Sequence, residues 1–104
     1  MENFDFVESG IIFGLTDRLT FRKFKYSSKD FAKHGDAYKF LTAHYDTYGE
    51  VPTAVTLCEN FPTLNPAAQD LNFDYALDTF QNQVLFRQVI NVFQENKELL
   101  SENP

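Results

Sequence analysis

Cysteine, tryptophan and glycine are scarce in this sequence. Its 104 residues include one cysteine, no tryptophan and four glycines. The single thiol of Cys58 excludes an intrachain disulfide and favours a reducing, cytoplasmic setting. Only His34 and His44 could join it as soft ligands, and their spacing does not resemble a zinc site. We therefore expect no metal and no cofactor.

Long apolar runs are also missing. No stretch approaches the roughly 18 uncharged apolar residues that span a bilayer. The opening, MENFDFVESG, carries acids where an export signal would carry bases. These two absences predict a protein that is neither exported nor embedded in a membrane.

The usual catalytic motifs are absent too. The sequence contains no G-x-x-x-x-G-K-[ST], no G-x-G-x-x-G and no G-x-S-x-G, which excludes common phosphate-binding loops and the nucleophile elbow. Asp30 and His34 stand four apart and would meet on a helix, but such a pair is more typical of a surface contact than of a general base. We expect that this chain is not an enzyme in itself.

What remains is a chain rich in phenylalanine and in helix signals. A hydrophobic share of 43% in 104 residues, with twelve Phe, suits one compact core. Residues 1–104 are therefore predicted to form a single domain. The expected fold is all-α, a small orthogonal bundle of about four to five helices that ends in a long C-terminal helix.

The first half of the chain predicts three helices. The first runs from Phe4 to about Leu15, and its Gly10 and Gly14 would let another helix cross closely. Residues 17–24 could form a short basic helix. A third helix is expected from Gly35 to Tyr48, with Gly49 as its C-terminal stop. The apolar positions of the first two are Phe4, Val7, Ile11, Ile12 and Leu15, followed by Leu19, Phe21 and Phe24.

The second half predicts a short helix and a long one. Thr53 is placed to cap a helix over 54–61, whose apolar positions are Val55, Leu57, Cys58 and Phe61. Pro62 and Pro66 bracket a loop that runs to about Leu71. Asn72 would then cap the last helix, over about 73–100.

The apolar face of that last helix changes sides midway. Phe73, Leu77, Phe80 and Val84 form one stripe, while Leu85, Phe86, Val89, Ile90, Val92 and Phe93 centre about 160° away around the axis. The first stripe can close the domain. The second then needs another cover, either a helix downstream of Pro104 or another subunit. The alternative is a bend that returns the helix to its own core.

Charge is unevenly distributed. The formal net charge of −6 argues against a domain whose main task is to grip phosphates. Residues 18–39 nevertheless hold seven of the nine bases against two acids, while residues 40–104 hold nine acids against two bases. This basic segment is either a solvated face or a steering patch for an acidic partner or DNA strand. Its candidate contact residues are Arg18, Arg22, Lys23, Lys25 and Lys29.

Other polar and reactive side chains are expected to be structural. His44 lies beside an apolar stripe and should be half-buried. Cys58 should be a buried, inert thiol. Tyr38, Tyr45 and Tyr48 have helical spacing, which favours core or interface positions over base stacking.

Four segments, in this order and spacing, resemble the N-terminal domain of a DnaB-type replicative helicase. The run FLTAHYDTYGEVPTAVTLCENFP is similar to its central stretch, VESGIIFGLTDR to its first helix, YSSKDF to a short segment ending in Phe, and NQVLFRQVINVF to its long helix. The resemblance extends from about Phe4 to Leu100. The Pro-bracketed loop replaces a helix of the cellular members, as in compact phage versions.

The resemblance implies a non-catalytic assembly and docking domain. Such domains pair through a helical hairpin, build the N-terminal collar of a hexameric ring, and offer surfaces to primase or helicase loader. The second hairpin arm would follow Pro104, and the ATP-dependent motor domain lies outside this chain. By the same resemblance, the self-association surface would comprise Leu85, Phe86, Val89, Ile90 and Phe93. DNA contact by the domain itself would be weak or absent.

A second interpretation stays open. The chain could be a stand-alone small phage or bacterial protein that interacts with DNA or has a regulatory role, and that uses the basic segment 18–39. Its sign would be a DNA affinity that falls steeply with salt.

Overall fold

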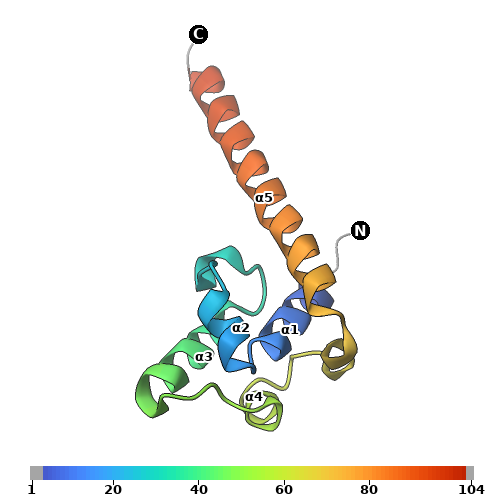
Figure 1. The fold of residues 1–104 in the computed structure, drawn as a ribbon. Coiled ribbons are helices and arrows are strands. Elements are labelled where there is room, and N and C mark those ends of the chain that lie inside the picture. The colour runs from blue at the N-terminus through green and yellow to red at the C-terminus, as the bar shows by residue number, and fades with distance from the viewer. Residues whose placement is uncertain (1–3, 103–104) are drawn as a thin grey trace.

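The structure is a computed structural model that describes the backbone of residues 4–102 and the side chains of residues 4–90. Within these residues it contains helices and no strand, which confirms the predicted all-α class (Figure 1). The elements in chain order are α1 (Phe4–Gly14), α2 (Arg18–Lys23), the 3-10 helix η1 (Ser28–Asp30), α3 (Gly35–Tyr48), α4 (Ala54–Asn60), the 3-10 helix η2 (Pro66–Asp70) and α5 (Phe73–Glu102).

Local sequence signals place the ends of these helices. The Thr53 hydroxyl accepts a hydrogen bond from the Thr56 amide at 3.2 Å, and the Asn72 side chain accepts one from the Tyr75 amide at 2.9 Å. Both predicted caps are therefore confirmed. Gly49 ends α3 in the left-handed conformation, with φ of 72°, as its predicted role as a stop requires.

The short basic helix α2 has a cap of its own. The Asp17 carboxylate accepts hydrogen bonds from the hydroxyl and the backbone amide of Thr20, at 2.8 and 3.0 Å. These two bonds hold the pKa of Asp17 below its usual value of 3.8. Phe21 and Phe24 pack against the core as predicted. Leu19 does not, because it points to solvent and is 65% exposed.

The segment predicted as a loop, from Pro62 to about Leu71, is partly helical. Pro66 opens η2, and the Asn65 side chain caps it by accepting from the Ala67 amide at 3.1 Å. Leu64 and Ala68 are buried, and η2 lies against α1. The segment predicted as a loop is therefore part of the cover of the core.

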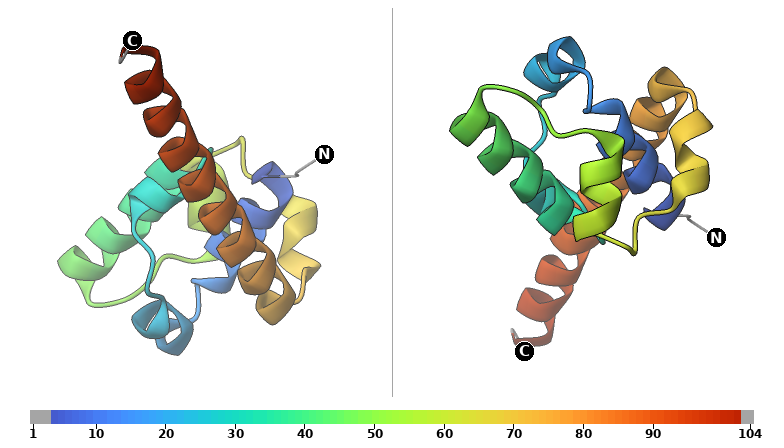
Figure 2. Two further views of the ribbon diagram at one scale, coloured as in Figure 1. Left: turned by 90° about the horizontal axis from the view of Figure 1, so that it is seen from above. Right: turned by 90° about the horizontal axis from the view of Figure 1, so that it is seen from below.

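Helix α1 is the centre of the domain. Every residue from Val7 to Phe13 is buried, so the helix is covered on all sides and not along one stripe. The first half of α5 and η2 both pack against it (Figures 1 and 2). Complete burial also encloses two polar residues of α1, Glu8 and Ser9, which must then find partners inside the protein.

The two glycines of α1 provide the space for this packing. A Cβ atom on Gly14 would fall 2.1 Å from Cδ1 of Phe73, the first residue of α5. A Cβ atom on Gly10 would fall 2.9 Å from Cδ2 of Leu71, just before α5. The prediction that this pair lets another helix cross closely is confirmed.

Phe80 joins α5 to the other side of the bundle. Its ring is fully buried, and its centroid lies 4.8 Å from that of Phe31, 5.2 Å from that of Tyr26 and 6.1 Å from that of Phe24. These rings come from the segments that flank η1. Tilted and edge-on aromatic contacts of this kind fill the space between α5 and the first half of the chain.

Helix α5 extends well beyond the bundle that it helps to build. Its 30 residues form one continuous helix, about 45 Å long. The longest extent of the molecule is therefore 56 Å, against 29 and 25 Å in the other two directions. Both views in Figure 2 show the C-terminal part of α5 leaving the other helices.

Replacing the two glycines by alanine should separate packing from helix propensity. Each change gains up to about 1 kcal/mol of propensity. At Gly14 the added methyl group forces the Phe73 ring to move, so we expect Gly14→Ala to destabilise the domain by about 1–3 kcal/mol. At Gly10 it meets only the end of a flexible leucine, so Gly10→Ala should be nearly neutral. Urea unfolding measures both, and equal stabilities would contradict this account of the crossing.

Candidate self-association surface

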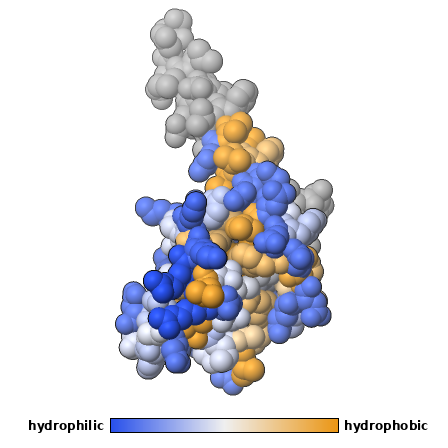
Figure 3. Space-filling model, viewed as in Figure 1, coloured by the Kyte–Doolittle hydropathy of each residue, from blue (hydrophilic) through white to orange (hydrophobic). Residues whose placement is uncertain are grey.

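A strip of large apolar side chains lies on α5 where the helix leaves the bundle. Leu85, Phe86, Val89 and Ile90 are 58%, 54%, 65% and 39% exposed. We call these four residues the α5 strip. Figure 3 shows it as a hydrophobic patch on the projecting helix. Phe93, also predicted to belong to this surface, and Val92 of the same predicted stripe lie outside the residues whose side chains are described.

The strip begins where the buried face of α5 ends. Ala76, Phe80, Gln83 and Val84 are buried against the bundle, and the residues of the strip come directly afterwards. Helical geometry of about 100° per residue places the centre of the strip about 135° around the helix from the centre of this buried face. The predicted change of sides near Val84 is thus present in the structure. The alternative, a bend that returns the strip to the core, is not observed, because α5 is one continuous helix and the strip is exposed.

Arg87 fastens α5 to the domain at this transition. Its guanidinium donates to the backbone carbonyl of Asp30, and its Cζ lies 5.5 Å from the centroid of the Phe4 ring. Both contacts are on the side of the helix away from the strip. Arg87 therefore holds the middle of α5 against η1 and α1 while the strip faces solvent.

The basic segment forms the surface around α2. Its candidate residues, Arg18, Arg22, Lys23, Lys25 and Lys29, are all exposed. Figure 3 shows strongly hydrophilic side chains gathered over α2. A shallow hollow lies where α3 begins and is bordered by Lys29, Lys33 and Lys39. The structure thus brings the bases of residues 18–39 onto α2, η1 and the start of α3.

A serine, a histidine and an aspartate meet in the interior. Nε2 of His34 lies 2.8 Å from Asp5 Oδ1 and 3.3 Å from Ser9 Oγ. In a Ser-His-Asp triad the serine and the acid bind opposite nitrogens of the imidazole, so that a proton can pass from one side to the other. Here both contact the same nitrogen, and Ser9 is completely buried. These three residues therefore act as a structural contact and not as an activated nucleophile.

The predicted Asp30–His34 pair does not form. These residues do not share a helix, since η1 ends at Asp30 and α3 begins after His34. The Asp30 carboxylate instead accepts from the Ser27 amide at 2.9 Å, which closes a capping box at η1. The histidine turns inward to α1, 29 residues away from its partner Asp5 in the chain.

Glu8 makes a structural contact that the sequence did not predict. Its carboxylate is fully buried and accepts three backbone hydrogen bonds, from Ala32 at 2.6 Å, Lys33 at 2.8 Å and His34 at 2.9 Å. Those amides precede α3, so the acid binds the entry to that helix directly to α1. The sequence signal for it is an acid among apolar residues of α1, and its position near the start of the helix has a local explanation in the helix dipole.

The remaining polar predictions have mixed outcomes. His44 is half-buried as expected, with Nδ1 2.8 Å from the Glu50 carbonyl oxygen. Cys58 is only half-buried, because α4 lies at the edge of the bundle and Leu57 is its one fully buried residue. Val55, predicted as an apolar contact of the same helix, is 68% exposed for the same reason.

The three tyrosines of α3 also differ from one another. Tyr38 and Tyr45 are half-buried, and their rings contact Phe21. Burial, with a smaller effect from the charge of Asp30, raises the pKa of Tyr38 above its usual value of 10.0. Tyr48 lies at the end of α3 and is exposed, so the core prediction is wrong for this residue.

Two further properties of the described residues bear on the kind of site present. Among the residues that the structure describes, no three His, Cys, Asp or Glu side chains come together as metal ligands. In the same part of the chain, no helix has the length and apolar character needed to cross a bilayer.

Removing the Glu8 carboxylate should expose the dependence of the fold on it. Glu8→Ala removes a buried carboxylate and leaves three backbone amides without their acceptor, and we expect a loss of about 3 kcal/mol in the free energy of unfolding. Glu8→Gln retains one acceptor oxygen, so its free energy of unfolding should lie between those of the wild-type chain and of Glu8→Ala. Exposed Glu59 on α4 offers the control, since Glu59→Ala should change stability by less than about 0.5 kcal/mol. Equal effects at the two positions in urea unfolding would contradict the role assigned to Glu8.

No family model, curated protein or solved structure matches this chain.

Proposed function

We propose that this chain is a non-catalytic assembly and docking domain that associates with copies of itself through the α5 strip. The single observation that carries the proposal is the solvent exposure of Leu85, Phe86, Val89 and Ile90 together on one helix. Contiguous apolar side chains of this size, on a helix face with no cover, are typical of protein interfaces.

The position of the strip supports an interface over a structural role. Its residues flank Arg87, which binds the domain from the other side of the helix, and their side chains are not part of the core. The outer face of α5 is also accessible before the strip, because Asp74, Tyr75, Asp78 and Asn82 are exposed. A partner helix can therefore lie along α5 without displacing any part of the bundle.

We further propose that the assembly is of the replicative helicase kind. The support is the resemblance of four segments to the N-terminal domain of DnaB-type helicases, together with a long helix whose apolar strip begins at the matching position. In that setting the domain would contribute to the collar of a hexameric ring and would offer surfaces to primase or helicase loader. The ATP-dependent activity would belong to another part of the protein.

Self-association can be tested by replacing Phe86 with a charged residue. Phe86→Asp places a carboxylate in the middle of the strip, and we expect the association constant to fall about thirtyfold or more, equivalent to ~2 kcal/mol. Sedimentation velocity over a range of concentrations measures the change. Circular dichroism should show unaltered helicity, because Phe86 is exposed. Ile90→Asp should act in the same direction.

Val55→Asp is the matched control for this test. Val55 is as exposed as the residues of the strip but lies on α4, so its replacement should leave association unchanged. An unaltered monomer at high concentration of the wild-type chain would exclude self-association through α5. It would leave the docking of other partners untouched.

The exposed bases of residues 18–39 support a second candidate function, contact with DNA. Arg22 and Lys25 both face solvent in the region around α2. If they bind phosphates, affinity for duplex DNA falls steeply with salt, and each replacement by alanine lowers the slope of log affinity against log salt by about 1. Fluorescence anisotropy measures this slope, and Lys97→Ala, outside the segment, is the control. A salt-independent or undetectable affinity would remove this candidate.

A further inference from the structure

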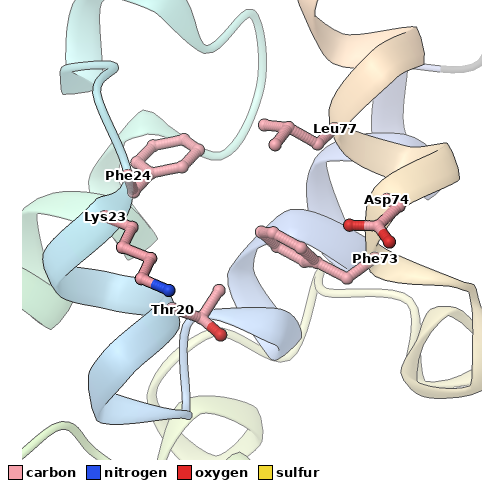
Figure 4. A pocket seen from close by; sticks show the side chains of 6 residues that line it. All are labelled: Thr20, Lys23, Phe24, Phe73, Asp74 and Leu77. Atoms are coloured by element: carbon pink, nitrogen blue, oxygen red, sulfur yellow. The ribbon is translucent and has the colours of Figure 1, made fainter.

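An apolar groove separates α2 from the first half of α5. One hollow of about 250 Å³ is lined by Thr20, Lys23, Phe24, Phe73, Asp74 and Leu77 (Figure 4). A second, of about 260 Å³, is lined by Lys23, Phe24, Lys25, Tyr26, Leu77 and Gln81. The two share Lys23, Phe24 and Leu77, so they are neighbouring parts of one groove, here called the α2–α5 groove.

The floor of the groove suits large apolar side chains. Phe24 contributes from the chain just after α2, while Phe73 and Leu77 contribute from successive turns of α5. In Figure 4 the side chains of Phe24, Phe73 and Leu77 surround the open space from both walls. Each hollow can take one leucine- or phenylalanine-sized group, and the two lie side by side. Two apolar side chains one helical turn apart match this arrangement.

The walls of the groove carry opposite charges. Lys23 and Lys25 stand on the α2 side, where Lys23 borders both hollows. Asp74 lies on the α5 side of the first hollow, which Thr20 lines from the α2 side. An occupant is therefore recognised in one orientation, with carboxylates toward the two lysines and no acid beside Asp74.

We propose that the α2–α5 groove binds an acidic amphipathic helix of a partner protein. The helix inserts two large apolar side chains, one turn apart, into the two hollows. Its glutamate or aspartate side chains line the flank that faces Lys23 and Lys25. Apolar burial supplies most of the affinity, and the charges select the orientation and speed the encounter.

The groove and the α5 strip can be occupied at the same time. At about 100° per residue, Phe73, Leu77 and Gln81 lie on a flank of α5 whose centre is about 150° around the helix from the centre of the strip. A helix in the groove therefore does not cover the strip. Docking at the groove consequently does not depend on the proposed self-association, and either can fail alone.

A second copy of this chain matches the groove poorly. The strip is its most extended exposed apolar surface among the described residues, and between residues 82 and 90 its only charged side chain is Arg87. That charge has the same sign as Lys23 and Lys25. A partner with acids beside its apolar pair is the better complement.

The test measures binding of a synthetic probe to the whole chain. The probe is a fluorescein-labelled amphipathic helical peptide with two leucines one turn apart and glutamates along one flank. A second peptide has lysine in place of each glutamate. In fluorescence anisotropy at low salt, we expect the acidic peptide to bind at least about tenfold more tightly than the basic one. Equal binding of the two peptides, or no binding of the acidic one, would overturn the proposal.

Two pairs of variants locate the binding site. Lys23→Glu combined with Lys25→Glu should weaken binding of the acidic peptide about tenfold or more. The control is Lys39→Glu, which lies at the hollow where α3 begins and should have little effect. Gln81→Trp fills the second hollow from an exposed position and should block binding, while exposed Asn82→Trp, one residue on, should not. Equal effects of the two members of either pair on peptide binding would show that the peptide does not bind in the α2–α5 groove.

Sedimentation of the same variants separates this proposal from self-association. The groove variants should leave the association constant of the chain unchanged, and Phe86→Asp should leave peptide binding unchanged. Loss of self-association in the Lys23 and Lys25 variant would identify the occupant as a second copy, which contradicts the proposal.

Discussion

The complete burial of α1 is the constraint on which the rest of the structure depends. A helix enclosed on every side cannot leave a carboxylate without partners, since an unpaired buried charge costs several kcal/mol. Glu8 meets this requirement by accepting three backbone amides that precede α3. The acid thus specifies where the basic segment returns to the core. Gly10 and Gly14 meet the steric side of the same constraint, because they admit Leu71 and Phe73 at close range.

Helix α5 serves two purposes in succession. Its first half packs Ala76, Phe80 and Val84 into the interior, and its second half presents the strip to solvent. Arg87 marks the boundary through its bond to the Asp30 carbonyl. Because core packing and the proposed self-association use different parts of one continuous helix, a substitution in the strip should alter association without altering stability. The α2–α5 groove lies on a third surface of the same helix, so the proposed docking is separate from both.

The sites differ in how far the sequence could predict them. The strip was predicted, because helical periodicity alone places Leu85, Phe86, Val89 and Ile90 away from Phe80 and Val84. The exposure of the bases around α2 followed from their charge. The groove was not predicted, because its two walls are separated by about fifty residues of chain and each wall looks like an ordinary amphipathic face. The Glu8 contact was missed for the same reason, since an acid early in a helix has a local explanation that needs no distant partner.

Local sequence signals are enough to predict the α-helices, the caps at Thr53 and Asn72, the stop at Gly49 and the change of apolar face along α5. These features depend on interactions within a few residues, where backbone geometry and periodicity suffice. The packing of the elements in space, in contrast, determines that His34 binds Asp5 and Ser9 and not Asp30, that η2 covers α1, and that α4 leaves Val55 and much of Cys58 uncovered. Such outcomes depend on which elements meet in space, and many arrangements of the same helices would satisfy the local pattern equally well.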